Sequence, residues 1–178
     1  MTEHDLTADE GRTYRYYPQS AASPLPIFEF GSGLSLTNFE TAADPIPASC
    51  SFPSDLRLNT AEESGCRVEV TAKNTGALKG DVVIAAYLKF KAVPSQVTSR
   101  MKKQLFDFVR LNDVLPGQTQ VATFHITPAA LAVSDVRNGN IISAAGSYEL
   151  SFEDGSGDSD KVQVTITGRD TVLSVFPA

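Results

Sequence analysis

The 178-residue sequence has no tryptophan and only two cysteines, two histidines and two methionines. Because His4 and His125 lie far apart and no C-x-x-C pattern occurs, the sequence does not indicate a metal site or a redox pair. No apolar run approaches the roughly 18–20 residues that a membrane-spanning helix needs. Residues 1–11 are polar and acidic and do not resemble a secretory signal. No membrane partner, metal or cofactor is therefore expected.

Basic residues are also in the minority. The chain has 15 Lys and Arg against 21 Asp and Glu, which gives a formal net charge of −6. An acidic surface repels phosphate backbones, so nucleic acid is not expected as a partner. The hydrophobic fraction of 42% is that of a globular chain and indicates one domain with its own core.

The two cysteines, Cys50 and Cys66, leave two alternatives open. A disulfide between them would close a short loop and stabilise the fold by roughly 3 kcal/mol in the chain-entropy treatment. Two free thiols are the other alternative. The choice depends on the redox compartment, which the sequence does not reveal.

The main pattern is an alternation of apolar and polar side chains with period two, which is typical of half-buried strands. It recurs in three places: Val68, Val70 and Ala72; Tyr148, Leu150 and Phe152; Val162, Val164 and Ile166. The nearly all-apolar run from Val82 to Leu88 suits a strand covered on both faces or one that faces another domain. Short strands separated by turn residues predict an all-β antiparallel sandwich.

Other segments are assigned by their local chemistry. Residues 1–27 show no period and are interpreted as an extended arm, in which Tyr14, Tyr16 and Tyr17 anchor the arm to a neighbouring domain. Thr127 to Leu131 suits a single helical turn with Thr127 as its N-cap. His125 falls on the polar side of a strand, and the run Arg100, Lys102 and Lys103 is interpreted as a solvated face.

No catalytic constellation is present. The sequence has no G-x-S-x-G elbow, no H-E-x-x-H and no P-loop. The acidic loop 154–160 alternates oxygen-bearing side chains as a calcium loop would, but it lacks the glycine and glutamate positions of that motif, so hairpin residues are the better interpretation. We therefore expect no catalytic, cofactor-binding or metal-binding residue.

One stretch resembles a known family. Pro26 to Phe39 is similar to the signature P-x-F-P-F-G-x-G-L-S-Y-T-x-F of family 3 β-glucosidases and β-xylosidases, and Gly11 to Tyr17 resembles the P-G-R-T-Y-R-Y stretch that precedes it. Further matches follow in the family's order at residues 68–76, 80–87, 104–119 and 145–150. Each match is weak alone, but together they cover nearly the whole chain.

The resemblance implies the C-terminal fibronectin type III-like domain of a family 3 glycoside hydrolase, an immunoglobulin/fibronectin type III-like antiparallel β-sandwich. Residues 1–35 would be the extended arm that follows the preceding α/β domain, and residues 36–178 the sandwich. The family's catalytic residues lie in domains that this chain does not contain, so none is carried over. The implied function is a non-catalytic module that stabilises the catalytic domains of an extracellular exo-β-xylosidase or β-glucosidase, and the sequence leans toward the xylosidase.

The residues that carry the resemblance have structural roles. The apolar residues Phe28, Phe30, Leu34 and Phe39 are expected to staple the arm onto a hydrophobic seam. The glycines Gly31 and Gly33 are expected to adopt backbone angles that a side chain would forbid. The remaining residues are the turn residues Asn74, Gly76, Pro116 and Gly117, and Gly146 with Tyr148 at the start of a late strand. Three positions depart from the family's pattern: Glu29, Leu36 and Asp107 stand where the family usually has proline, tyrosine and glycine.

The alternative is a free-standing module that binds a polysaccharide or a cell-surface protein. Sugar-binding faces stack aromatic rings on pyranose rings, and the lack of tryptophan counts against this alternative. A stabilising module should instead expose an apolar patch where its partner domain would lie.

Overall fold

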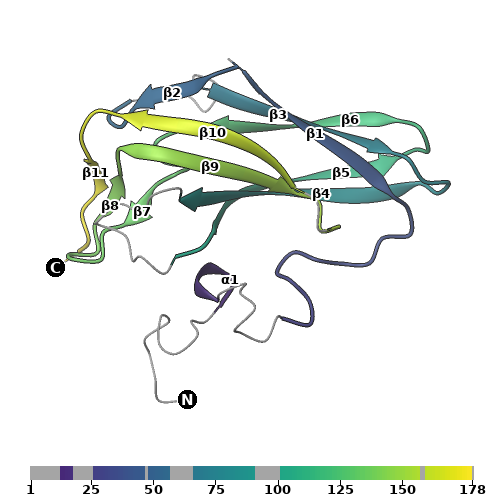
Figure 1. Cartoon of the computed structure of the whole chain (residues 1–178), viewed down its shortest axis with the longest axis horizontal. Helices are drawn as coiled ribbons and strands as arrows, with labels where there is room; N and C mark the ends of the chain where they lie inside the picture. The colour runs from purple at the N-terminus through teal and green to yellow at the C-terminus, as the bar shows by residue number, and fades with distance from the viewer. Residues whose placement is uncertain are drawn as a thin grey trace.

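The computed structural model describes residues 13–17, 26–46, 48–56, 66–90, 101–156 and 159–177. Within them lie one short helix and eleven strands (Figure 1): α1 Thr13–Tyr16, β1 Phe39–Ile46, β2 Cys50–Pro53, β3 Cys66–Asn74, β4 Gly80–Phe90, β5 Gln104–Val114, β6 Thr119–Ile126, β7 Val133–Ser134, β8 Ile141–Ser143, β9 Gly146–Glu153, β10 Ser159–Thr167 and β11 Thr171–Ser174.

Two sheets face each other. One has three strands in the order β1-β3-β6, and the other has five in the order β2-β10-β9-β4-β5. A small sheet, β11-β8-β7, lies at one end (Figure 1). Neighbouring strands are antiparallel except β10 and β2, which run parallel. The predicted all-β, fibronectin type III-like sandwich is confirmed.

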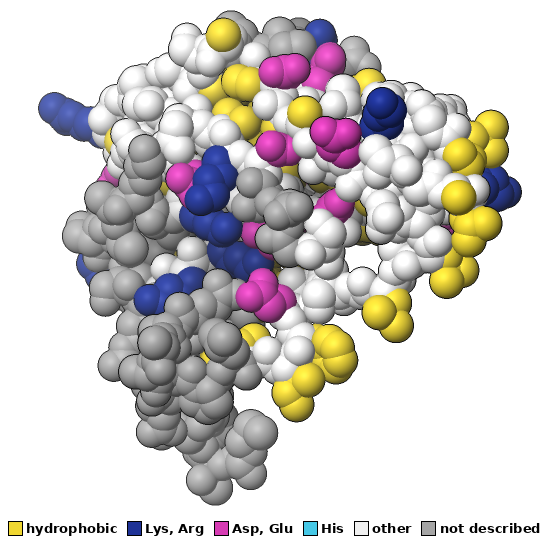
Figure 2. Space-filling view, turned by 45° about the vertical axis from the view of Figure 1, so that its right-hand side comes forward, with side chains coloured by type: hydrophobic (Ala, Val, Ile, Leu, Met, Phe, Trp, Pro, Cys, Tyr) yellow, Lys and Arg dark blue, Asp and Glu magenta, His cyan; other side chains and the backbone are white. Residues whose placement is uncertain are grey.

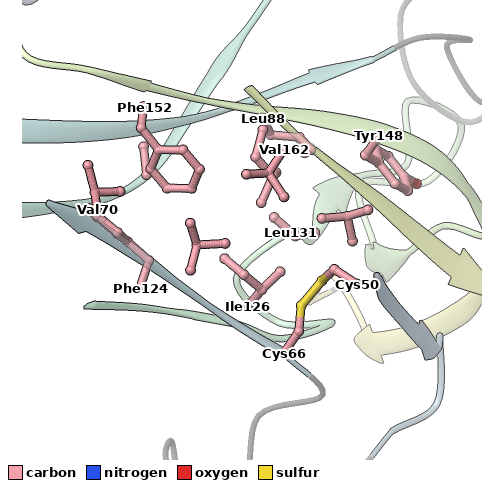
Figure 3. Close-up of a cluster of buried hydrophobic side chains, with 14 of the residues drawn as sticks. Cys50, Cys66, Val70, Leu88, Phe124, Ile126, Leu131, Tyr148, Phe152 and Val162 are labelled. Carbon is pink, nitrogen blue, oxygen red and sulfur yellow. A yellow bond between two sulfur atoms is a disulfide. The ribbon is translucent and has the colours of Figure 1, made fainter. Parts of the chain in front are cut away.

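The core lies between the two sheets and follows from the period-two alternation. Val68 and Val70 of β3 point inward and are fully buried, as are Leu150 and Phe152 of β9. The rings of Phe124 and Phe152 approach from opposite sheets, with centroids 5.1 Å apart (Figure 3). Because each strand buries every second side chain, its other face remains available for contacts outside the core.

Asn74, a predicted turn residue, is a fully buried polar junction at the end of β3. Its Nδ2 donates to the carbonyl oxygens of Leu78 (2.8 Å) and Val114 (2.9 Å). Its Oδ1 accepts from the Thr37 hydroxyl (2.7 Å) and the Gly76 N–H (3.0 Å). All four hydrogen-bonding positions of the amide are filled, so Asn74 ties the residues before β1 to the turn after β3 and to the end of β5.

The other predicted turn residues lie close to this junction or to the small sheet. Pro116 and Gly117 form the turn between β5 and β6, and the Gly117 N–H donates to the Asn74 carbonyl oxygen (2.8 Å). Gly146 begins β9, and the buried Tyr148 hydroxyl donates to the Ala144 carbonyl oxygen.

The turn at residues 127–131 forms as its sequence suggests. The Ala130 N–H donates to the Thr127 hydroxyl oxygen at 3.0 Å, the bond that an N-cap makes. The turn carries the chain from β6 to β7.

A disulfide joins Cys50 of β2 to Cys66 of β3, so the structure has the first of the two alternatives that the sequence leaves open. The two strands belong to different sheets, and both sulfur atoms are buried at one end of the core (Figure 3). The bond therefore links the two layers of the sandwich directly.

Asn74→Ala should destabilise the fold by roughly 3 kcal/mol, because it removes the partner of the buried Val114 carbonyl and the buried Thr37 hydroxyl, and of the part-buried Leu78 carbonyl and Gly76 N–H. Urea unfolding would measure the change in free energy of unfolding. The control is Asn112→Ala at an exposed position, which should change it by less than about 0.5 kcal/mol. Equal effects of the two substitutions would contradict the role of Asn74.

The Cys50→Ser, Cys66→Ser double variant should lose about 3 kcal/mol of stability relative to the oxidised protein, because its unfolded state is no longer restricted by the closed loop. Thermal and urea unfolding would measure this. Dithiothreitol should lower the midpoint of the wild-type chain and leave the double variant unchanged. Equal midpoints for the oxidised and reduced wild-type chain would refute the expectation.

Candidate interaction surface

The chain before β1 turns back below the five-stranded sheet, where α1 also lies (Figure 1). We call the described residues before β1, 13–17 and 26–38, the arm. A groove of about 1480 Å³ opens between the arm and the outward face of the sheet, lined by arm residues and by side chains of β4, β5 and the end of β9. The first described strand begins at Phe39, and the domain boundary between residues 35 and 36 stays a prediction.

Three aromatic rings join the arm to the sheet. Tyr14 of α1 stacks on Phe30 with ring centroids 4.1 Å apart. Both rings meet Tyr87 of β4 edge-on, at 6.2 Å and 6.4 Å. Tyr87 points away from the sandwich core, yet only 1% of it is exposed. The expected anchoring role of Tyr14 is therefore directed at the sandwich itself and not at a further domain.

A carboxylate lies beside this aromatic group. Glu153, the last residue of β9, accepts hydrogen bonds from Lys103 Nζ (2.8 Å), Lys89 Nζ (3.2 Å) and the Ser151 hydroxyl (2.8 Å). The Lys103 ammonium also lies 4.1 Å from the centroid of the Tyr87 ring, a cation–π contact. Two ammonium groups thus balance the charge of Glu153, and the Ser151 hydroxyl adds a third hydrogen bond.

The environment shifts the pKa of two of these groups. Burial raises the pKa of the Glu153 carboxyl, but the hydrogen bonds of Lys103 and Ser151 and the charges of both lysines outweigh it, so that its pKa lies below its ordinary value of 4.5. Burial, followed by the charge of Glu153, raises the pKa of Tyr87 to about 12. Both groups therefore keep one charge state, ionised for Glu153 and neutral for Tyr87, across the physiological pH range.

The prediction that Arg100, Lys102 and Lys103 form a solvated face is wrong for Lys103. Its side chain is 12% exposed, because it is enclosed between Glu153 and the Tyr87 ring. Lys102 is exposed as predicted, and Arg100 lies outside the described residues. A single positive charge before a strand carries no sign of a partner fifty residues later, so the sequence could not indicate this contact.

Two glycines allow the arm to approach closely. Gly31 has a φ of 90°, and a Cβ at this position would lie 3.0 Å from the Tyr87 hydroxyl oxygen. Gly155, just after β9, has a φ of 85°. A Cβ on Gly155 would lie 2.7 Å from the Gly31 carbonyl oxygen. The expectation for Gly31 agrees with this geometry. It does not hold for Gly33, which has no positive φ and no described atom within 4 Å of the place a Cβ would take.

We call Tyr14, Phe30, Tyr87, Lys103 and Glu153 the arm–sheet lock. Two backbone bonds reinforce it: the Leu105 N–H donates to the Tyr14 hydroxyl oxygen (3.2 Å), and the Lys102 N–H donates to the Arg15 carbonyl oxygen (2.6 Å). The lock thus attaches the arm to β4 and the start of β5, and Glu153 of β9 joins it through Lys103.

Other arm residues remain uncovered. Four large apolar residues, which we call the apolar ridge, are almost fully exposed: Ile27, Phe28, Leu34 and Leu36. Figure 2 shows hydrophobic side chains protruding at the lower edge of the molecule, below the main body of the sandwich. The expected stapling holds for Phe30 and for Phe39, which packs against the core, but not for Phe28 and Leu34. Phe28 and Leu34 stay exposed, and the ring that meets Tyr87 from this segment is that of Phe30.

The described residues offer little for catalysis. No three of their Cys, His, Asp or Glu side chains are arranged to hold a metal ion. In the acidic loop, the Asp154 carboxylate accepts from the Ser156 N–H and hydroxyl, as in an ordinary turn, and residues 157–158 lie outside the described part. No helix in the described segments is long and apolar enough to cross a membrane.

One signal in the sequence did indicate the covered face. The nearly all-apolar run from Val82 to Leu88 suggests a strand covered on both faces, and the structure places Tyr87, the outward residue near its end, under the arm. Glu153 carries no comparable signal, because an acidic residue at the end of a strand ordinarily faces solvent.

Comparison with known proteins agrees with this fold. Residues 82–156 match the Fibronectin type III-like domain family. Over 185 residues, the chain is 28% identical to an exo-1,4-beta-xylosidase of Emericella nidulans, covering 99% of this chain and 22% of the relative. It is 28% identical over 168 residues to a xylan 1,4-beta-xylosidase of Xylanibacter ruminicola, covering 94% of this chain and 17% of the relative.

Solved structures of β-xylosidases and β-glucosidases also superimpose on this chain. An exo-beta-xylosidase of glycoside hydrolase family 3, in complex with a xylobiose aziridine probe, superimposes with a TM-score of 0.74 at 26% identity, covering 95% of this chain and 22% of that chain. A beta-glucosidase from Listeria innocua in complex with gluconolactone gives 0.67 at 25% identity, covering 92% and 22%. The chain thus spans about a fifth of the length of the relatives it matches.

Glu153→Gln should destabilise the chain at neutral pH and much less in acid. A carboxyl whose pKa is lowered by folding contributes stability above its ordinary pKa of 4.5, and this contribution is lost as the pH falls through the lowered value. The difference in free energy of unfolding between the wild type and the variant should therefore shrink below pH 4.5, as measured by urea unfolding at several pH values.

The matched control is Glu149→Gln on the same strand, whose ion pair with Lys161 is longer at 3.7 Å and more exposed. It should change stability little at any pH. A difference between wild type and Glu153→Gln that is the same in acid and at neutral pH would show that Glu153 does not depend on its charge.

Proposed function

Because the chain carries the fibronectin type III-like domain of the C-terminal type found in family 3 glycoside hydrolases, we propose that it is a non-catalytic module that braces the catalytic domains of a β-glycosidase of that family. The observation that carries the proposal is the apolar ridge. Leu36 is 88% exposed and Ile27 93%, which is costly in water unless another surface covers them.

The partner that fits best is the catalytic part of the enzyme itself. The relatives are about five times longer than the region they share with this chain, and the ridge lies on the arm that enters the sandwich from its N-terminal side. An exo-β-xylosidase is the favoured parent, since the names of the curated relatives cited above are xylosidases.

The disulfide supports an extracellular location for the protein. Disulfides form and persist in oxidising compartments and are rare in the cytosol. The bond between Cys50 and Cys66 is buried at one end of the core and links the two sheets. An extracellular glycosidase is a setting in which such a bond forms.

A chimera would test the bracing role. The segment of the Emericella nidulans exo-1,4-beta-xylosidase that matches this chain is exchanged for the chain, and hydrolysis of an aryl β-xyloside and the rate of thermal inactivation are measured. We expect an active chimera. Replacement of all four ridge residues by serine should speed its thermal inactivation at least fivefold, because the contact with the catalytic domains loses its apolar surface.

The control replaces Leu115 and Val121, two exposed apolar residues outside the arm, by serine. It should leave the inactivation rate within about twofold of the unsubstituted chimera. Equal inactivation rates for the ridge and control variants would overturn the proposal.

The isolated chain should hydrolyse neither aryl β-xyloside nor aryl β-glucoside, since the described residues show no catalytic arrangement. Turnover that persists after rigorous purification would overturn the non-catalytic role. Strong retention on insoluble xylan would instead favour the alternative, a free-standing polysaccharide-binding module.

A further inference from the structure

The arm is attached at two places, and the ridge lies around them. At one place, Phe30 stacks on Tyr14 and Gly31 lies against the Tyr87 hydroxyl. At the other, the Thr37 hydroxyl donates to the buried amide oxygen of Asn74 (2.7 Å). Leu34 and Leu36 lie between these attachments, and Ile27 and Phe28 lie directly before the first. The position of the ridge is therefore determined by the two attachments.

We propose that the arm–sheet lock holds the arm in one orientation and so presents the apolar ridge preformed, with Glu153 and Tyr87 as positioning residues of the docking surface. The consequence for docking rests on the proposed function. The lock itself is a property of the isolated chain.

Glu153 is the residue on which the lock depends. The Lys103 ammonium is largely enclosed, and Glu153 is the carboxylate that it contacts, at 2.8 Å. Without that carboxylate, an ammonium held over the Tyr87 ring lacks its counter-charge and must reach water instead. Tyr14 and Phe30 meet the same Tyr87 ring edge-on, so a Lys103 side chain that leaves the ring for water removes one of the contacts that hold Tyr87 in place under the arm.

The lock also protects an edge. β5 is the last strand of the five-stranded sheet, and its first residues are those that the arm contacts. The Leu105 N–H bonds to the Tyr14 hydroxyl, and the Lys102 N–H, just before the strand, bonds to the Arg15 carbonyl. These two amides therefore report directly whether the arm is in place.

Preformed surfaces bind more tightly than mobile ones, because binding does not have to order the chain and so loses less conformational entropy. A ridge on a freely moving arm would have to be ordered anew on each encounter. The lock removes that requirement, since rings from the arm and charges from the sheet already fix the segment.

Hydrogen exchange on the isolated chain tests the lock. In Glu153→Gln, which keeps the shape of the side chain and removes its charge, the amides of Lys102 and Leu105 should exchange at least tenfold faster than in the wild type. The amides of β3, on the other sheet, should speed up by no more than the fall in the free energy of unfolding accounts for. Glu149→Gln, on the same strand and without a contact to the arm, should leave both groups of amides at the wild-type rate.

Tyr14→Ala opens the lock from the arm side without altering the sheet, and it should give the same pattern as Glu153→Gln. Exchange of Lys102 and Leu105 within twofold of the wild type in both variants would overturn the lock. Faster exchange of the β3 amides, equal to that of the two reporting amides, would also overturn it, because Glu153 would then serve the whole sandwich.

The chimera separates this inference from the proposed function. If the ridge variant inactivates faster and Glu153→Gln does not, the lock fails as a positioning device while the bracing role stands. If the ridge variant has no effect, the bracing role fails, and the exchange rates of the isolated chain still decide the lock. Faster inactivation in both variants supports the inference.

Discussion

The outward face of β4 is the constraint on which this surface depends. Strands bury one face in the core, and Tyr87 places a large aromatic ring on the other face, where water would meet it. The chain covers that ring with its own arm, through Tyr14 and Phe30. With the arm in this position, its other large apolar residues, the apolar ridge, remain almost fully exposed.

The charged groups beside Tyr87 fit the same arrangement of arm and sheet. A half-buried carboxylate is costly unless donors surround it, and Glu153 has three, from β4, β9 and the segment before β5. One of these donors, Lys103, is itself held over the Tyr87 ring. The ion pair and the aromatic contacts are thus parts of one structure.

The alternation of apolar residues was sufficient to predict the sandwich, because a period of two identifies the buried face of a strand from local sequence alone. The turn at Asn74 was also predictable, but its role as a junction was not, since its partners at Thr37 and Val114 depend on the tertiary fold. For the same reason, local sequence alone predicts a solvated Lys103. Phe28 and Phe30 look equivalent in sequence, and only the tertiary fold decides that Phe30 is the one whose ring meets Tyr14 and Tyr87.

The apolar ridge is the surface that we propose for contact with the catalytic part of a family 3 β-glycosidase. Carbene footprinting of Phe28 and Leu34 tests it most directly, because the reagent labels side chains according to their exposure. Both residues should be labelled in the isolated chain and protected in the xylosidase chimera, with Val121 labelled equally in the two. Equal labelling of Phe28 and Leu34 in the isolated chain and in the chimera would contradict the account.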